Sequence, residues 1–108
     1  MDTIKKLKNE IHNFTVERDW DQFHTPANLA KSISIEANEL LECFQWNEAN
    51  YSLDAVKEEL ADVLIYCITM ADKMNLDIEE IIEDKIKINA KKYPIEKAKG
   101  NAKKYNKL

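Results

Sequence analysis

Four carboxylates in this sequence come in two pairs with the same spacing. Glu36 and Glu39 are separated by three positions in SIEANELLECFQW, and Glu59 and Asp62 by three positions in EELADVLIY. On a helix, residues three apart are neighbours on one face. Carboxylate oxygens are the ligands that Mg²⁺ prefers, with water and substrate phosphates completing its shell. The pairs therefore predict a divalent-metal site, or else two acidic and solvated helix faces, since Glu is common on helix surfaces.

Other chemistries have weaker support. A di-iron site would need Glu-x-x-His pairs, and the two histidines, His12 and His24, lie outside both acidic stretches. Cys43 and Cys67 belong to no nucleophile motif and are expected to be reduced thiols in or near the core. With Gly100 as the only glycine, no Gly-rich phosphate loop is present.

Helices are expected to position these residues. One Gly and two Pro in 108 residues, with 44% hydrophobic residues, favour an all-α single domain. Apolar periodicity and capping residues predict helices over 2–18, 25–46, 52–74 and 77–92, the last ended by Tyr93-Pro94. Short connections between four helices predict a four-helix bundle.

The second and third helices are expected to form an antiparallel hairpin. Each acidic pair is about two turns from the connecting loop, so the two pairs should face each other at one height. The third helix is apolar on more than one side: Leu60, Val63, Leu64 and Cys67 share one side, and Ile65 points roughly opposite. The core face is expected to consist of Val56, Leu60, Val63, Cys67 and Met74. A single small chain would leave part of this surface wet, which predicts an oligomer.

Charge is distributed unevenly along the chain. Residues 1–84 hold 7 basic and 19 acidic residues, a net charge of −12, whereas residues 85–108 hold nine Lys and one Glu, a net charge of +8. The basic end could be a solvated tail, or it could supply cations to a phosphate ligand. The acidic body would repel a polyanion, so no nucleic-acid partner is expected. No signal-like or membrane-spanning run is visible, and a cytoplasmic protein without membrane contact is expected.

The acidic motifs, taken with their surroundings, resemble a known family. ExxE, a spacer and ExxD form the signature of the MazG-related, all-α nucleoside triphosphate pyrophosphohydrolases. ERDWDQFHTPANL, FQW and KYP are similar to the dCTP pyrophosphatase branch of that family. The resemblance extends from about Phe14 to Leu108 and implies one domain over 1–108, with 93–108 as a basic C-terminal tail.

The resemblance implies Mg²⁺-dependent hydrolysis of a nucleoside triphosphate, dCTP or a modified dCTP, to the monophosphate and pyrophosphate. Mn²⁺ would be an alternative ion, and the assembly would be a homodimer or homotetramer. The four carboxylates Glu36, Glu39, Glu59 and Asp62 would be the metal ligands and catalytic residues. The substrate-binding residues implied by the same resemblance are Trp20, Asp21, Gln22, Phe23, His24, Trp46, Tyr66, Lys85, Asn89 and Tyr93.

Some of these roles have an independent physical basis. Trp20 and Trp46 could stack on both faces of a base, although core filling is the ordinary role of Trp. Asp21, Gln22 and His24 offer donors and acceptors for a base edge. One position departs from the family: Ile11 stands where relatives carry a histidine, and His12 is one position away.

Two other functions fit the same sequence less well. A catalytically silent helical adaptor could use this fold to bind nucleotides or a protein, but it would not require all four acids together with the aromatic residues. A nucleic-acid-binding module using the basic end is opposed by the acidic body.

Overall fold

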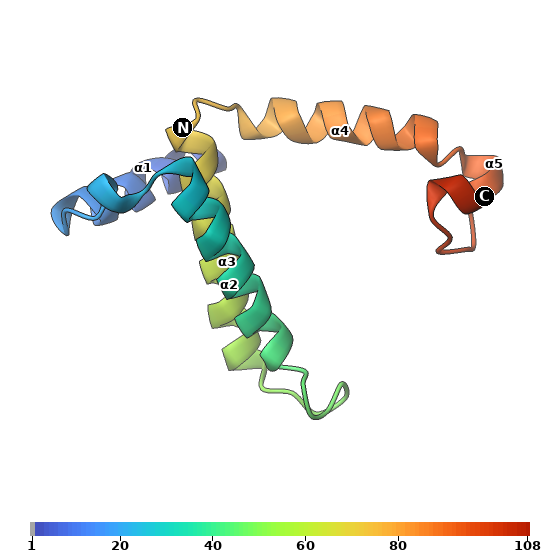
Figure 1. Ribbon diagram of the computed structural model, residues 1–108, viewed down its shortest axis with the longest axis horizontal. Helices are drawn as coiled ribbons and strands as arrows, with labels where there is room; N and C mark the ends of the chain where they lie inside the picture. Colours follow the sequence, from blue (N-terminus) through green and yellow to red (C-terminus); the bar gives the residue numbers. More distant parts are fainter. Residues whose placement is uncertain (1) are drawn as a thin grey trace. The chain divides into compact units, whose positions relative to one another are not determined.

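The computed structural model describes residues 2–108, and every regular element within them is helical (Figure 1). The long helices are α1 Thr3–Glu17, α2 Pro26–Glu42, α3 Leu53–Lys73 and α4 Ile78–Lys92, and the short elements are η1 Asp21–Phe23, α5 Ile95–Ala98 and η2 Tyr105–Lys107. The predicted all-α fold is confirmed. No helix in the described part of the chain has the length and apolarity needed to cross a bilayer.

All four long helices begin with the same type of N-terminal cap. A polar side chain just before the helix accepts a hydrogen bond from the backbone N–H three residues later, which satisfies one of the free donors of the first turn. The capping residues are Asp2, Thr25, Ser52 and Asp77, with N···O distances of 2.9, 3.1, 3.2 and 3.0 Å. These four residues are the first residues of the four predicted helical ranges, so the predicted helix starts are confirmed.

Helix α2 ends four residues earlier than predicted. The backbone N–H groups of residues 43–45 bond to carbonyls three residues back, a tightening typical of a helix end. The Asn47 side chain then accepts hydrogen bonds from the N–H groups of Ala49 and Asn50, at 2.9 and 3.0 Å, and shapes the loop. Trp46 consequently lies in this loop and not on the helix.

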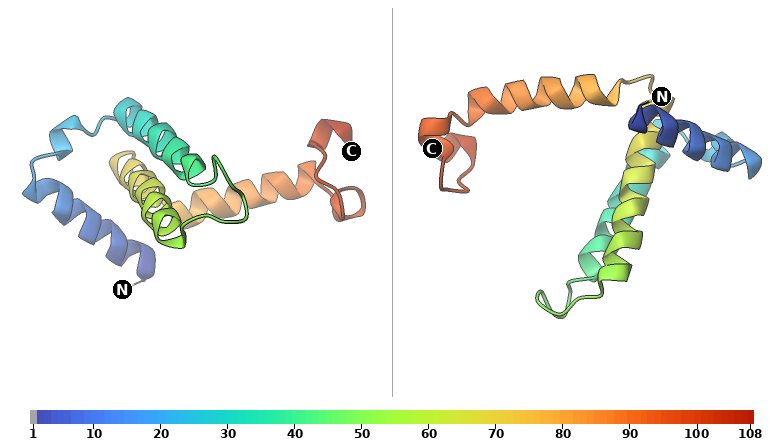
Figure 2. Two further views of the ribbon diagram at one scale, coloured as in Figure 1. Left: turned by 90° about the horizontal axis from the view of Figure 1, so that it is seen from below. Right: turned by 180° about the vertical axis from the view of Figure 1, so that it is seen from behind.

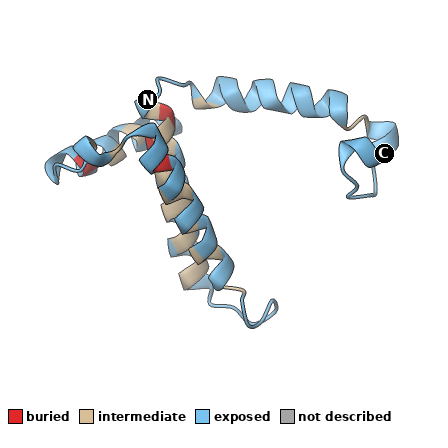
Figure 3. Cartoon of the chain, in the orientation of Figure 1, coloured by how far each residue is buried: buried red, intermediate tan, exposed pale blue. Residues whose placement is uncertain are grey.

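The chain divides into two compact units, the first ending at Leu76 and the second beginning at Asp77. In the first unit α2 and α3 form the predicted antiparallel pair, and α1 packs on α3 (Figures 1 and 2). The buried residues are few: Leu29 of α2, Thr15 of α1, and Thr69 and Ala71 of α3. Leu29 belongs to the start of α2, Thr69 and Ala71 to the end of α3, and Thr15 to the end of α1; Figure 3 shows the buried positions in red.

The side of α3 that faces the other helices matches the predicted one only in part. Leu60, Cys67 and Met74 were expected in the core and are exposed, whereas Val56 and Val63 are partly buried as expected. The partly buried side carries residues at helical spacing: Val56, Glu59, Val63, Tyr66 and Met70. The pattern failed in part because the inner side of this helix includes the acidic residues.

The second unit contains α4, α5 and η2. Pro94 follows α4 directly, and the Tyr93 N–H closes the helix on the Asn89 carbonyl at 2.8 Å. The Tyr93 and Tyr105 rings meet edge to face with centroids 6.2 Å apart, and Lys92 Nζ lies 4.9 Å from the Tyr105 ring centre. The basic segment 93–108 therefore has local structure of its own.

Candidate active site

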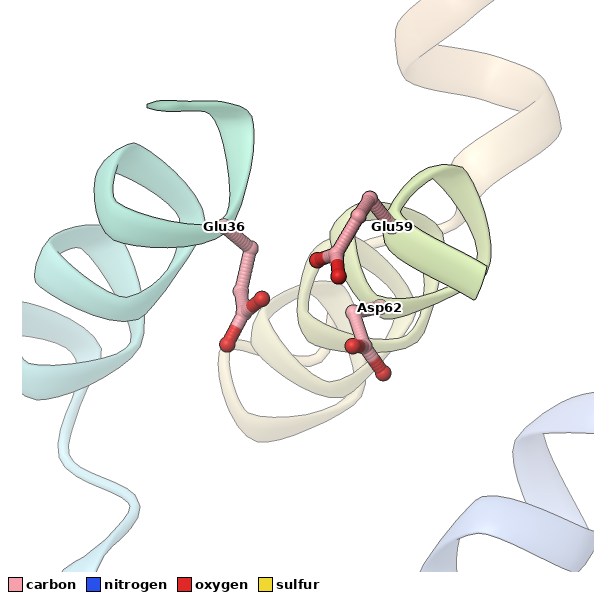
Figure 4. A group of neighbouring side chains, drawn as sticks. All are labelled: Glu36, Glu59 and Asp62. Atoms are coloured by element: carbon pink, nitrogen blue, oxygen red, sulfur yellow. The ribbon is translucent and has the colours of Figure 1, made fainter. Parts of the chain in front are cut away.

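Three of the four carboxylates come together between α2 and α3. One oxygen each of Glu36, Glu59 and Asp62 lies within 4.8 Å of the others. Figure 4 shows Glu36 reaching across from α2 toward the two acids on α3. The acids of α2 therefore face those of α3, as predicted. The antiparallel hairpin places positions 36 and 59 at the same level along the two helix axes.

Glu39 completes the group, one turn after Glu36. Hydrogen bonding with Glu39, loss of hydration and the neighbouring charges raise the pKa of Glu36 to about 7. Loss of hydration, followed by hydrogen bonding with Glu39, raises the pKa of Glu59. Carboxylates this close disfavour one another's ionised form, so the cluster requires protons or a cation.

The cluster has the features of a cation site. Glu36 Oε2 and Glu59 Oε2 are buried with no hydrogen-bond partner. A buried polar atom without a partner costs free energy, and a bound cation would remove that cost. All the donors are carboxylate oxygens, the ligand type that suits hard divalent ions. These residues therefore fit a divalent metal.

A cavity of about 400 Å³ adjoins the cluster, and Asp62 belongs to both. Trp20, His24 and Tyr66 line it, together with apolar side chains of α1 and α3. The His24 and Tyr66 rings meet edge to face with centroids 6.4 Å apart. The volume is within the range of small-molecule sites, which are mostly apolar with a few polar groups. Two carboxylates, Asp62 of α3 and Glu10 of α1, thus line this cavity, and the rest of the lining is largely apolar and aromatic.

The segment from Trp20 to His24 does not act as a single surface. Trp20 and His24 line the cavity, but the Asp21 carboxylate is bound by Lys73 Nζ at 2.7 Å. The Gln22 side chain donates to the Asp19 carbonyl and carboxylate, both at 3.0 Å. Phe23 is exposed. Two of the five predicted residues therefore reach the cavity within one chain.

Trp46 is not brought to this cavity within the first unit. Trp46 is 89% exposed in the α2–α3 loop. Trp20 precedes the start of α2 and Trp46 follows its end, so the 17 residues of that helix, at about 1.5 Å each, separate them. The two Trp rings therefore do not face each other within one chain, and their stacking on one base stays a prediction for an assembly. Lys85, Asn89 and Tyr93 belong to the second unit.

The departure from the family at Ile11 also has a structural consequence. Ile11 lines the 400 Å³ cavity. His12 lines a neighbouring polar cavity of about 230 Å³ with Lys8, Asp72 and Lys73. His12 therefore does not replace the family histidine at the aromatic cavity in this structure.

Two residues that line the cavity, Phe14 and Ile65, were not predicted from the sequence as site residues. Phe14 of α1 meets Trp20 edge to face, with ring centroids 5.7 Å apart, and Ile65 of α3 lies beside Tyr66. Ile65 was expected to be covered by another subunit. The available signal was the spacing of Asp62, Ile65 and Thr69, which continues one helical face beyond the acidic pair.

Known proteins resemble this chain over both units. The model of the MazG-like family matches residues 31–108, which include all four carboxylates. The dCTP pyrophosphatase 1 proteins of Mus musculus and Homo sapiens are each 35% identical to it over 96 residues, covering 81% of this chain. The chain spans 56% of the length of these relatives.

One solved structure is similar in both sequence and fold. A pyrophosphatase from Archaeoglobus fulgidus superimposes with a TM-score of 0.77 and 38% identity. The match covers 87% of this chain and 94% of that protein.

Proposed function

Because the chain belongs to the MazG-like family, we propose that it hydrolyses a nucleoside triphosphate to the monophosphate and pyrophosphate. The observation that carries this proposal is the position of Asp62, which lies in the carboxylate cluster and also in the wall of the aromatic cavity. A triphosphate beside the cluster would have its base within reach of that cavity. The names of the similar proteins, two dCTP pyrophosphatases and a pyrophosphatase, agree with this reaction.

The ion proposed for the cluster is Mg²⁺, with Mn²⁺ as an alternative. Glu36, Glu39, Glu59 and Asp62 would hold it, and the unpaired oxygens of Glu36 and Glu59 support this assignment. When bound, Mg²⁺ supplies charge neutralisation and polarisation of the triphosphate. Mg²⁺ keeps several waters and binds through few protein carboxylates, which suits a cluster that a substrate phosphate completes.

The chain's own residues have three tasks in this reaction. Trp20 and Tyr66 offer aromatic surfaces for the base and exclude water from it. The carboxylate cluster would hold the ion beside the triphosphate. One of the four carboxylates accepts a proton from the water that attacks the α-phosphorus, as the bond from that phosphorus to the pyrophosphate oxygen breaks. Cations such as Lys85 would offset the charge of the departing pyrophosphate.

The proposed substrate is dCTP or a dCTP modified at the base. His24 lines the cavity and can donate to or accept from a base edge. An apolar pocket rejects isosteric bases weakly, whereas a polar group left unpaired by a wrong base costs about 1–3 kcal/mol. Selectivity among pyrimidines would therefore depend on His24 more than on Trp20.

The remaining residues implied by the resemblance also belong to this proposal. Trp46, Lys85, Asn89 and Tyr93 would contact substrate in a homodimer or homotetramer. Large exposed apolar residues on the first unit, including Leu41, Leu60 and Leu64, support an assembly, since contiguous apolar surface is usually covered.

Product analysis tests the reaction directly. The purified protein is incubated with dCTP and Mg²⁺, and we expect dCMP and pyrophosphate in equal amounts, with kcat/KM for dCTP above that for dUTP, dTTP, dATP and dGTP. Release of dCDP and phosphate would contradict the proposed bond cleavage. A purine nucleotide ahead of dCTP would overturn the pyrimidine assignment alone.

A further inference from the structure

The segment that carries Trp20 and His24 touches α3 at two points. His24 meets Tyr66 edge to face, and the Asp21 carboxylate receives Lys73 Nζ at 2.7 Å. The second contact is the shortest of the three ion pairs found in the described part of the first unit, since Arg18 and Glu17 lie 3.7 Å apart and Lys8 and Asp72 3.9 Å apart. Asp21 is only one residue from Trp20, so its position constrains the indole.

Helix α3 places these contacts at fixed intervals. Asp62, Tyr66, Thr69 and Lys73 follow steps of four, three and four, which keep residues on one helical face. The carboxylate cluster is at one end of this stripe, the aromatic cavity in the middle and the ion pair at the other end. Asp62 and Lys73 are eleven residues apart, about 16 Å along the axis.

We propose that Lys73 is a positioning residue: its ion pair with Asp21 holds the Trp20–His24 segment against α3, so that Trp20 and His24 line the cavity beside Asp62. The link to catalysis rests on the proposed function. Local hydrogen bonds shape this segment: Gln22 donates to Asp19, and the Asn28 side chain donates to the Phe23 carbonyl. None of these bonds reaches α3, so they do not attach the segment to that helix.

The same ion pair changes the role expected of Asp21. A carboxylate that reads a base edge must offer its oxygens to the base. Here a hydrogen bond from Lys73 is the largest cause that lowers the pKa of Asp21, and the carboxylate lines the polar cavity with His12. Asp21 therefore acts on the substrate through the segment it anchors, and it is not placed to contact the base in the neighbouring cavity.

A double-mutant cycle with a matched control tests this role. Lys73→Met should release the segment. Only the fraction of molecules in which the segment is held against α3 binds the nucleotide, so KM for the preferred nucleotide should rise about three- to ten-fold while kcat changes little. Lys73→Arg should restore KM, since Arg also pairs with a carboxylate. Asp21→Asn should behave like Lys73→Met, and the double variant should be no worse than either. The control is Lys8→Met, which removes a lysine from the same polar cavity without touching residues 19–24.

Additive effects of Asp21→Asn and Lys73→Met on KM would overturn the inference. An equal rise in KM in Lys8→Met would also overturn it. A decrease in kcat alone in Lys73→Met would overturn it too, because that is the result expected when a smaller fraction of the protein is folded.

A spectroscopic measurement separates positioning from catalysis. In a Trp46→Phe background, Trp20 is the only Trp, and acrylamide quenching reports its exposure without substrate. Quenching of Trp20 should be stronger in Lys73→Met than in the Trp46→Phe parent. It should be at the parent level in Lys73→Arg and in Lys8→Met. Unchanged quenching in Lys73→Met overturns the positioning role even in an active enzyme. If the wild-type protein has no pyrophosphohydrolase activity, the proposed function fails, and the quenching series still decides whether Lys73 positions Trp20.

Discussion

Neutralising Glu36 should stabilise the metal-free protein at alkaline pH. The pKa of this group is raised from 4.5 to about 7. The folded state therefore holds a proton that the unfolded state has lost, so stability is complete below pH 4.5 and decreases as pH rises through 7. The full shift corresponds to about 3 kcal/mol. Because Glu36 is partly exposed, solvent screening reduces this to about 1–2 kcal/mol.

Thermal unfolding in EDTA measures this effect. Glu36→Gln should match the wild type at pH 4.5 and unfold about 4–8 °C higher at pH 8, given about 4 °C per kcal/mol for a chain of this size. Glu42→Gln is the matched control, since Glu42 lies exposed on the same helix, and it should shift the Tm little at either pH. If the Tm of Glu36→Gln and the Tm of the wild type changed in parallel between pH 4.5 and pH 8, crowded carboxylates would not destabilise this site.

Three further predictions concern metal, base and assembly. Mg²⁺ binding at pH 7 should release protons, because it displaces those held by the cluster, and calorimetric heats should depend on the ionisation enthalpy of the buffer; heats independent of the buffer would contradict this. Trp20→Ala should raise KM about ten-fold or more for every nucleotide, since stacking contributes about 1–3 kcal/mol whatever the base, and a change limited to one nucleotide would argue against stacking. Light scattering should show a dimer or tetramer because Leu41, Leu60 and Leu64 are exposed in the single chain, whereas a monomer at micromolar concentration would contradict the proposed assembly.

Local signals in the sequence were sufficient for the helices and for the cluster. Capping side chains depend on the nearest few residues, so the starts marked by Thr25 and Asp77 could be predicted directly. The hairpin of α2 and α3 then determines that Glu36 faces Glu59, because only the loop position and the helical rise are needed.

Long-range packing was less predictable. The apolar pattern predicted the core face of α3 only in part. Val63 is partly buried as expected, but Leu60 and Cys67 are exposed, and Glu59 and Tyr66 lie on the partly buried side. The role of Asp21 could not be predicted either. Its partner, Lys73, is 52 positions away, and the contact depends on how the segment after α1 returns to α3.

In the proposed function, the carboxylates between α2 and α3 carry out triphosphate hydrolysis. The most direct test compares turnover of dCTP with Mg²⁺ by the wild type, Glu59→Gln and Glu58→Gln, with far-ultraviolet circular dichroism to confirm folding. Glu58 is the adjacent, exposed carboxylate outside the cluster. We predict that Glu59→Gln lowers kcat about a hundred-fold or more while Glu58→Gln stays near the wild type. Near-normal turnover by Glu59→Gln, and likewise by Asp62→Asn, would contradict the assignment of this site.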